Sequence, residues 1–139
     1  MDLIEERQRD IIEEFSMFDD WMDKYSLIID MAKDLEPLPD SDRIDDNLIK
    51  GCQSKVWLTA DNDGEKVHFH ADSDAIITKG LVSLMISVLS DASHEDIMKA
   101  DLHFIDDIGL QEHLSPTRSN GLAAMVKQMK MYALALSAK

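Results

Sequence analysis

The sequence predicts an α+β fold: a small antiparallel sheet of about three strands, flanked by helices. Two observations carry this prediction. Apolar residues recur every three or four positions in the first and last thirds of the chain, and they alternate with a period of two around a glycine-containing turn in the middle. At 139 residues the chain has the usual size of a single domain, so we expect residues 1–139 to form one.

Two amphipathic helices are predicted before residue 37. The apolar face of the first carries Ile4, Ile11, Ile12 and Phe15. The stripe of the second steps by four, three, four and three residues through Trp21, Tyr25, Ile28, Ala32 and Leu35. Pro37 and Pro39 should end this helix, because proline cannot continue the hydrogen-bond ladder. Residues 37–46 are then expected to form an acidic, extended connection.

Strands are predicted in the middle of the chain. Leu48 and Ile49 suggest a short strand, and residues 51–53 the loop after it. Residues 56–60 form the second predicted strand and residues 66–71 the third, with Val67, Phe69 and Ala71 on one face. Residues 61–64 should be the turn of an antiparallel hairpin, because Gly64 tolerates positive φ.

Helices dominate the remainder. Asp72, Ser73 and Asp74 offer N-cap side chains to a helix that we expect to be the most buried. Its predicted core positions are Ile76, Ile77, Gly80, Leu81, Leu84, Met85 and Val88. A short helix over 93–99 has Ser93 and Asp96 as a capping pair, whereas residues 102–110 are ambiguous. Ser115 and Pro116 are typical of a helix start. The core face of this last helix is expected at Leu122, Met125, Val126, Met129, Ala133 and Leu136.

Composition narrows the function classes. The formal net charge of −14 repels phosphate backbones and so disfavours nonspecific binding of nucleic acid. No apolar run approaches the roughly 20 residues that cross a bilayer. The first residues are acidic, where a secretory signal would be basic and then apolar. We therefore expect a cytoplasmic protein, with no membrane or nucleic-acid partner, whose thiol is reduced.

Cys52 is the only cysteine, so it can form no intrachain disulfide and no structural zinc site by itself. Two interpretations are open. It is either a small buried hydrophobe, which is the usual fate of a free cysteine, or a lone nucleophile that meets a sulfur atom of another molecule. A reactive thiolate in so acidic a chain needs positive charge nearby, for which Lys50, Lys55, Arg43 and Arg118 are the candidates.

Other polar clusters have simpler explanations. His68 and His70 lie two apart on one strand face, but they lack a third ligand, so a solvated polar face is favoured over a metal site. The segment 114–121 is either an elaborate helix cap or a loop that presents Arg118 to a partner or to Cys52. For Asp74, two roles are equally open: capping of a helix and contact with a partner. No resident metal or other cofactor is predicted.

Three motifs, in order along the chain, resemble the SufE family of sulfur-acceptor proteins, which includes the closely related CsdE group. They are residues 51–58 (GCQSKVWL), residues 71–75 (ADSDA) with 79–81 (KGL), and residues 113–122 (HLSPTRSNGL). The segment 35–39 (LEPLP) and the pair Trp21 and Tyr25 also fit. The motifs do not separate the SufE branch from the CsdE branch.

The resemblance implies a fold like that of the IscU and NifU scaffold proteins. It also implies that the chain accepts sulfane sulfur from a pyridoxal-phosphate cysteine desulfurase of the SufS or CsdA type, stimulates that enzyme and passes the sulfur toward iron–sulfur cluster assembly, for example to a scaffold protein. The acceptor cysteine of the family maps onto Cys52. The supporting or interface residues are then Lys50, Gly51, Gln53, Lys55, Asp72, Asp74 and Arg118.

On this interpretation the chain is a monomeric partner with a persulfide-forming cysteine, and it is not an independent enzyme. We expect Cys52 to rest against apolar residues in the free protein and to swing out on docking. Two alternatives remain. The chain could be a noncatalytic adaptor that regulates a desulfurase through its acidic surface, or an iron-binding scaffold or chaperone that uses His68 and His70. The single cysteine argues against a cluster scaffold, since scaffolds hold a cluster with several.

Overall fold

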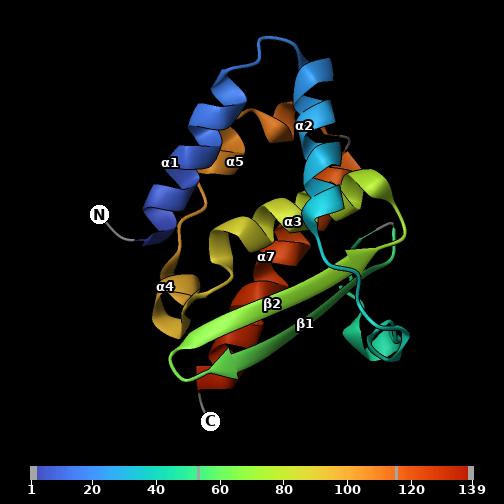
Figure 1. The fold of residues 1–139 in the computed structure, drawn as a ribbon, viewed down its shortest axis with the longest axis vertical. Helices are drawn as coiled ribbons and strands as arrows, with labels where there is room; N and C mark the ends of the chain where they lie inside the picture. Colours follow the sequence, from blue (N-terminus) through green and yellow to red (C-terminus); the bar gives the residue numbers. More distant parts are fainter. Residues whose placement is uncertain (1–2, 53, 115, 138–139) are drawn as a thin grey trace.

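A computed structural model describes residues 3–52, 54–114 and 116–137 (Figure 1), apart from the side chains of residues 111, 113, 117 and 118. It confirms the predicted α+β class. The order of elements along the chain is α1 (Leu3–Ser16), α2 (Trp21–Asp34), two 3₁₀ turns (Asp40–Asp42 and Asp45–Asn47), β1 (Val56–Asp63), β2 (Lys66–Ser73), α3 (Ile76–Leu89), β3 (Ala92–Ser93), α4 (His94–Lys99), α5 (Phe104–Asp107), α6 (Leu110–His113) and α7 (Pro116–Ser137).

The sheet is a long antiparallel hairpin with one short added strand, in the order β1-β2-β3. Residues pair from Val56 with Ser73 through to Asp63 with Lys66. The alternation in β2 is the predicted one, since Val67, Phe69 and Ala71 are buried and face the core. The sheet therefore presents one apolar face to the helices, while Lys66, His68 and His70 alternate with these residues and lie on the other face.

Helix α3 is the central element of the core, as the sequence predicted. It packs against α2, β2, α7 and α1, and most of its residues are buried. It lies very close to α2 at Gly80, where an added Cβ would lie 2.3 Å from the carbonyl oxygen of Ile28. Only glycine allows the two helices to come this close. At the other end of α3, Arg7 of α1 donates to the carbonyl oxygens of Val88 and Ser90.

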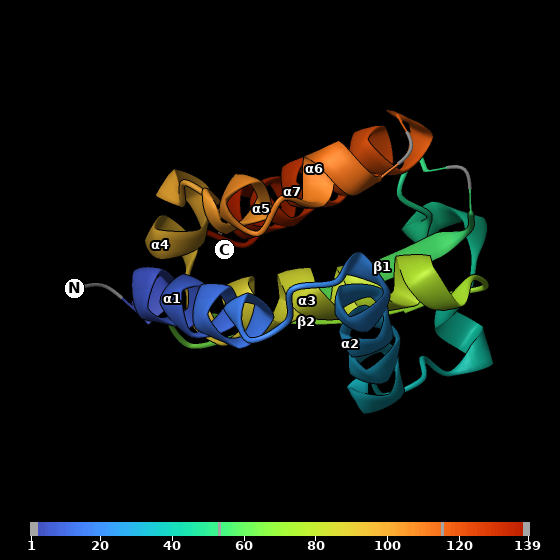
Figure 2. The same cartoon turned by 90° about the horizontal axis from the view of Figure 1, so that it is seen from above.

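The helices lie on both sides of this centre. Seen from above, α5, α6 and α7 run along one side of the molecule, and α2 lies on the opposite side (Figure 2). The long helix α7 lies beside the hairpin and inserts Leu122, Met125, Met129 and Ala133 into the core, as its spacing predicted. These side chains anchor α7 in the core, and Gly121 of α7 lies next to Cys52, in the loop that precedes β1.

Two strand predictions were wrong in detail. Residues 48 and 49 do not form the short first strand that was predicted: Leu48 makes a single bridge to Trp57, because a 3₁₀ turn ends just before it and Gly51, with φ +96°, turns the chain just after it. The third strand is β3, over residues 92–93. The hairpin turn is also shorter than expected. β1 continues through Asp63, so that only Gly64 (φ +61°) and Glu65 connect the strands.

Some helix predictions also need correction. The N-cap of α3 is Ala75, with no side-chain hydrogen bond, because Asp72 and Asp74 accept hydrogen bonds from other segments. Ile76, expected in the core, is half exposed at the first position of α3. Residues 37–46 contain two 3₁₀ turns where a fully extended connection was expected. Residues 116–121 are the first turns of α7 and not a loop, whereas Ser115 lies outside the described residues.

Other predicted features agree with the structure. Helix α2 ends at Asp34, ahead of Pro37. The hydroxyl of Ser93 caps α4 by accepting from the backbone N–H of Asp96, at 3.1 Å. The ambiguous segment 102–110 contains α5 and the start of α6.

Candidate functional site

Cys52 lies on a short loop whose two ends are held against the sheet. Before the cysteine, the backbone N–H of Ile49 donates to the carbonyl of Val56, at 2.9 Å. After it, Lys55 exchanges two hydrogen bonds with Asp74, from its own N–H to the carboxylate and from the N–H of Asp74 to its carbonyl. The loop over residues 50–55 is thus fixed at both ends. This agrees with the expected position at the rim of the sheet.

The thiol of Cys52 rests on α7. Its Sγ lies 3.6 Å from the carbonyl oxygen of Gly121, to which the S–H can donate, and the residue is half-buried beside the hydrophobic core. A Cβ on Gly121 would lie 3.4 Å from this sulfur. One turn further along α7, Ala124 faces Gly51, where an added Cβ would lie 3.3 Å from the alanine Cβ. The absence of side chains at both glycines lets the loop lie flat on the helix.

Burial raises the pKa of the Cys52 thiol, because a thiolate would lose hydration in this position. Lys50 and Lys55 are exposed, and neither forms an ion pair within the described part of the chain. Arg43 is directed at Asp72. Arg43 is therefore paired with a carboxylate, and neither lysine is held in place by an ion pair.

Asp72 is the centre of a buried polar cluster. Its carboxylate accepts hydrogen bonds from the guanidinium of Arg43 (2.5 Å) and from the backbone N–H groups of Leu38 (3.2 Å) and Ser73 (2.8 Å), and the ammonium of Lys79 lies 3.3 Å away. Burial by itself would disfavour the carboxylate. The hydrogen bonds and the two cations outweigh that penalty and lower the pKa of Asp72.

This cluster connects three segments that precede or flank the Cys52 loop. Leu38 and Arg43 come from the connection after α2, and Lys79 comes from the first turn of α3. The guanidinium of Arg43 also lies over the ring of Trp57 in β1, with 5.9 Å to the ring centroid. Asp72 therefore fixes the chain that leads into the loop, and it does not cap α3.

Two predicted residues cannot be placed fully. Gln53 lies outside the described residues. Arg118 belongs to the first turn of α7 by its backbone, but its side chain lies outside the description. Sequence reasoning also missed a residue: Gly121 contacts the thiol directly. It belongs to the third motif, yet nothing in a helical glycine indicates which distant side chain it will meet.

His68 and His70 are engaged by carboxylates. His68 Nδ1 is hydrogen-bonded to Asp91, and His70 Nε2 lies 2.9 Å from Asp61. Among the described residues, no group of three or more histidine, cysteine, aspartate or glutamate side chains is arranged to hold a metal ion. The polar-face interpretation of these two histidines fits their contacts.

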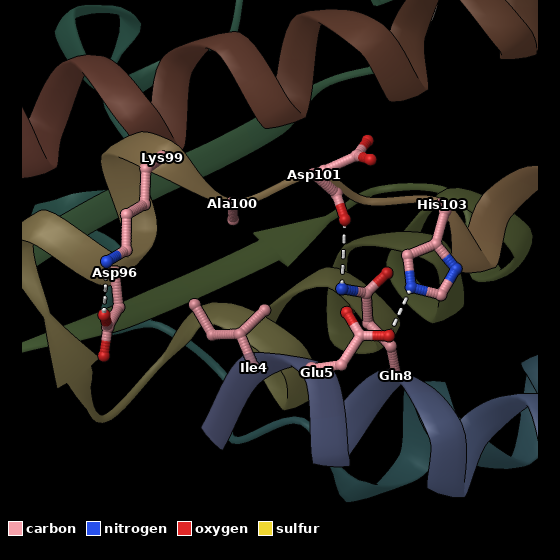
Figure 3. Close-up of a pocket in the computed structure, with 8 residues that line it drawn as sticks. All are labelled: Ile4, Glu5, Gln8, Asp96, Lys99, Ala100, Asp101 and His103. Atoms are coloured by element: carbon pink, nitrogen blue, oxygen red, sulfur yellow. Dashed lines mark hydrogen bonds and ion pairs between the residues drawn. The ribbon is translucent and has the colours of Figure 1, made fainter. Parts of the chain in front are cut away.

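A separate polar pocket lies between α1 and the chain after α4, far from Cys52 in the sequence (Figure 3). Within it the buried amide of Gln8 donates to the carbonyl of Asp101 and accepts from the N–H of Phe104, both at 3.1 Å. His103 bridges Glu5 of α1, at 2.8 Å, and Asp107 of α5, at 2.6 Å. These contacts join α1 to α5 and satisfy the buried amide, so the pocket is explained by its structural contacts.

Comparison with known proteins places this geometry in a family. The family model for SufE, described as an Fe-S metabolism associated domain, matches residues 9–133. The chain belongs to the SufE family. An uncharacterised SufE-like protein of Rhizobium meliloti (strain 1021) is 37% identical over 125 residues, which cover 86% of this chain and 89% of that protein. The SufE resemblance stated from the three motifs is therefore confirmed.

A solved structure supports the fold of the chain. The solution structure of a hypothetical protein from Thermus thermophilus superposes with a TM-score of 0.79 and 20% sequence identity, covering 96% of this chain and 97% of the other. At that identity the likeness concerns the fold alone. Over the described residues, no helix of this SufE-family chain has the length and apolar character required to span a membrane.

Proposed function

We propose that this protein accepts sulfur on Cys52 from the persulfide of a pyridoxal-phosphate cysteine desulfurase, stimulates that enzyme, and passes the sulfur on for iron–sulfur cluster assembly. The observation that carries the proposal is the position of the only thiol. It lies at the surface end of the sheet, on a loop held at both ends, in a chain whose family is associated with Fe-S metabolism.

The chemistry is a thiol–disulfide type of exchange between two proteins. The Cys52 thiolate attacks the outer sulfur of the desulfurase persulfide, R–S–S–H. A new sulfur–sulfur bond forms on Cys52 as the old one breaks, and the bonding pair leaves with the desulfurase cysteine as R–S⁻. Cys52 then carries –S–S–H. The transferred sulfur keeps its oxidation state, so the step needs no external oxidant or reductant.

The resting site fits an acceptor that reacts only with its partner. Burial holds the thiol in its neutral form by raising its pKa, and a neutral thiol is a poor nucleophile. Docking must therefore expose the sulfur or bring positive charge to it. Lys50 and Lys55, both exposed at the ends of the loop, are available to an acidic partner surface or to the departing thiolate. Asp72 and Asp74 support the loop from the sheet side, and Gly51, Gln53 and Arg118 complete the proposed site.

Intact-mass spectrometry tests the proposal. The protein is incubated with a cysteine desulfurase and free cysteine, beside a Cys52→Ser variant. Addition of one sulfur atom to the wild type, removed by reduction and absent from the variant, is the expected result. If the variant stimulates the desulfurase as well as the wild type does, and the wild type gains no sulfur, the protein is an adaptor and the relay is wrong.

Its location and assembly are part of the same proposal. We propose a cytoplasmic monomer that needs no cofactor of its own. The net charge of −14 supports a monomer, since copies of the chain repel one another. Sedimentation of the free protein, in which a dimer would contradict the proposal, measures this directly.

A further inference from the structure

Helix α7 has a second apolar surface, which faces solvent and not the core. Together with α4, which packs directly on α7, it forms an open groove of about 490 Å³. The apolar walls of the groove are Met98 of α4 and, on α7, Ala123, Val126, Met131 and Leu134. Met131 is 52% exposed and Leu134 61%, although both are large hydrophobic side chains. The groove therefore leaves apolar surface in contact with water in the free protein.

The sequence of α7 differs from that of an ordinary surface helix. A helix that buries one face in the core normally carries charged and polar residues on the opposite face. In α7 the core face includes Met125 and Met129, yet the outward positions Ala123, Met131 and Leu134 are apolar too. Apolar residues on both sides are typical of a helix that is covered on both sides. The outer face of α7 thus has the composition of a surface that a partner covers.

Charge indicates which kind of segment fits the groove. The chain has 28 acidic residues, but none of them lies in Pro116–Ser137, and the described residues that line the groove include no carboxylate. They do include Lys127 and Lys130, neither of which forms an ion pair within the described part of the chain. The ammonium of Lys130 donates to the carbonyl of Ala100, at 2.6 Å, which holds this cation at the edge of the groove.

We propose that the groove between α4 and α7 is a docking site for an acidic amphipathic helix of a partner protein. The wall on α7 extends from Ala123 to Leu134, a rise of about 16 Å or three helical turns. A groove of this length takes the apolar side chains of a docked helix at spacings of three and four residues. Met98 and Met131 can adapt to their shape, and carboxylates beside them would pair with Lys127 and Lys130.

The groove is separate from the thiol. Gly121 and Ala124 meet the loop that carries Cys52. Lys130 comes nine residues after Gly121, and at about 100° per residue it lies on the opposite side of α7. A helix docked in the groove would therefore leave Cys52 open to a desulfurase. The inference goes beyond sulfur acceptance and does not depend on it, and it gives the protein a second surface that can hold a further partner.

The test uses a defined probe, a synthetic peptide of about 18 residues that forms a helix with leucine on one face and glutamate on the other. A scrambled peptide of the same composition, whose leucines do not share a face, is the control. Binding is followed by the amide chemical shifts of the isotope-labelled protein. Two variants are compared with the wild type. Met131→Glu and Met22→Glu each add one negative charge at an exposed methionine of a helix, but only Met131 lines the groove.

The expected result is that the amphipathic peptide, and not the scrambled one, shifts the amides of α4 and of residues 123–134. Met131→Glu should weaken binding about tenfold and Met22→Glu less than twofold, because a charge in the groove both removes apolar contact and repels the glutamates. The rate of Cys52 alkylation by iodoacetamide should not change when the peptide binds. Thermal unfolding checks that the variants fold, and Lys127→Glu, at another exposed position of the groove, replaces Met131→Glu if that variant does not.

The absence of binding to the wild type would overturn the proposal, and so would equal weakening by the two methionine variants. Two other occupants are tested with the same variants. A dimer seen in sedimentation of the wild type and lost in Met131→Glu would assign the groove to a second copy of the chain. Binding to phosphatidylglycerol vesicles that is lost in Met131→Glu would assign it to a membrane surface. Either result would contradict an acidic protein partner, and none of these measurements bears on sulfur transfer to Cys52.

Discussion

Replacement of Asp72 by asparagine tests the assignment of this residue as the centre of a buried charge cluster. Asparagine keeps the size of the side chain and one acceptor oxygen, so the hydrogen bonds from the backbone can partly survive. The substitution removes the negative charge that Arg43 and Lys79 share, with the Asp72 side chain 2% exposed, Arg43 36% and Lys79 23%. Two cations would then face a neutral, nearly buried amide.

The magnitude follows from this burial. Removing one partner of a fully buried ion pair costs about 3–5 kcal/mol. Both cations here keep some contact with water, so we expect a loss of about 2–4 kcal/mol in the free energy of unfolding at pH 7. For a chain of this size that loss corresponds to a fall of roughly 10 °C in the unfolding temperature.

Urea unfolding of Asp72→Asn and of Asp74→Asn is the assay. Asp74 lies two residues away, is exposed and accepts from the backbone N–H of Lys55, so its substitution should cost about 1 kcal/mol or less. If both variants lower the free energy of unfolding by the same small amount, the Asp72 cluster contributes little to stability and the reasoning is wrong.

The pH dependence gives a second check on Asp72. The pKa of this carboxyl group is lowered in the folded state. Its contribution to the free energy of unfolding is therefore fully present above the pKa of the unfolded chain, about 4, and is lost as the pH falls through the pKa of the folded protein. The difference in free energy of unfolding between the wild type and Asp72→Asn should therefore be constant near neutral pH and should become smaller in acid. A gap that widens in acid would contradict the sign of the shift.

Two further predictions concern the packing of α2 and the contact between α1 and α5. Gly80→Ala should destabilise the protein by about 3 kcal/mol, because the new Cβ would lie 2.3 Å from the Ile28 carbonyl oxygen and the helices must separate; a thermal melt like that of the wild type would contradict this. Hydrogen bonds to Asp107 and Glu5 raise the pKa of His103 above its ordinary value, so its stabilisation is present at and below about pH 6.5 and is lost as the pH rises through the folded value. His103→Gln should therefore differ from the wild type in urea unfolding at pH 6 and much less at pH 9, and an equal difference at both would refute the assignment.

The fold was predictable from sequence wherever one side of an element is buried. The alternation in β2 and the stripe of α2 follow directly from contact with a single core, and the hairpin follows from its turn. The third strand could not be found in this way. β3 has two residues, and it is defined by hydrogen bonds to Lys66 and Val67 and not by a pattern of its own. Leu48 and Ile49 have the apolar character of a strand, but backbone turns on either side leave room for one bridge only.

The candidate site, too, could be predicted only where it depends on neighbours in the chain. A lone cysteine next to a glycine is visible in the sequence, and so is a loop before a strand, because both depend on neighbours in the chain. What the thiol touches depends on a residue 69 positions away. Of the cations predicted to activate Cys52, Arg43 instead pairs with Asp72, and the sulfur meets a carbonyl oxygen that favours its neutral form. If the proposed relay is correct, the free protein is therefore built to keep its thiol unreactive, and activation has to come from the docked partner and from movement of the loop.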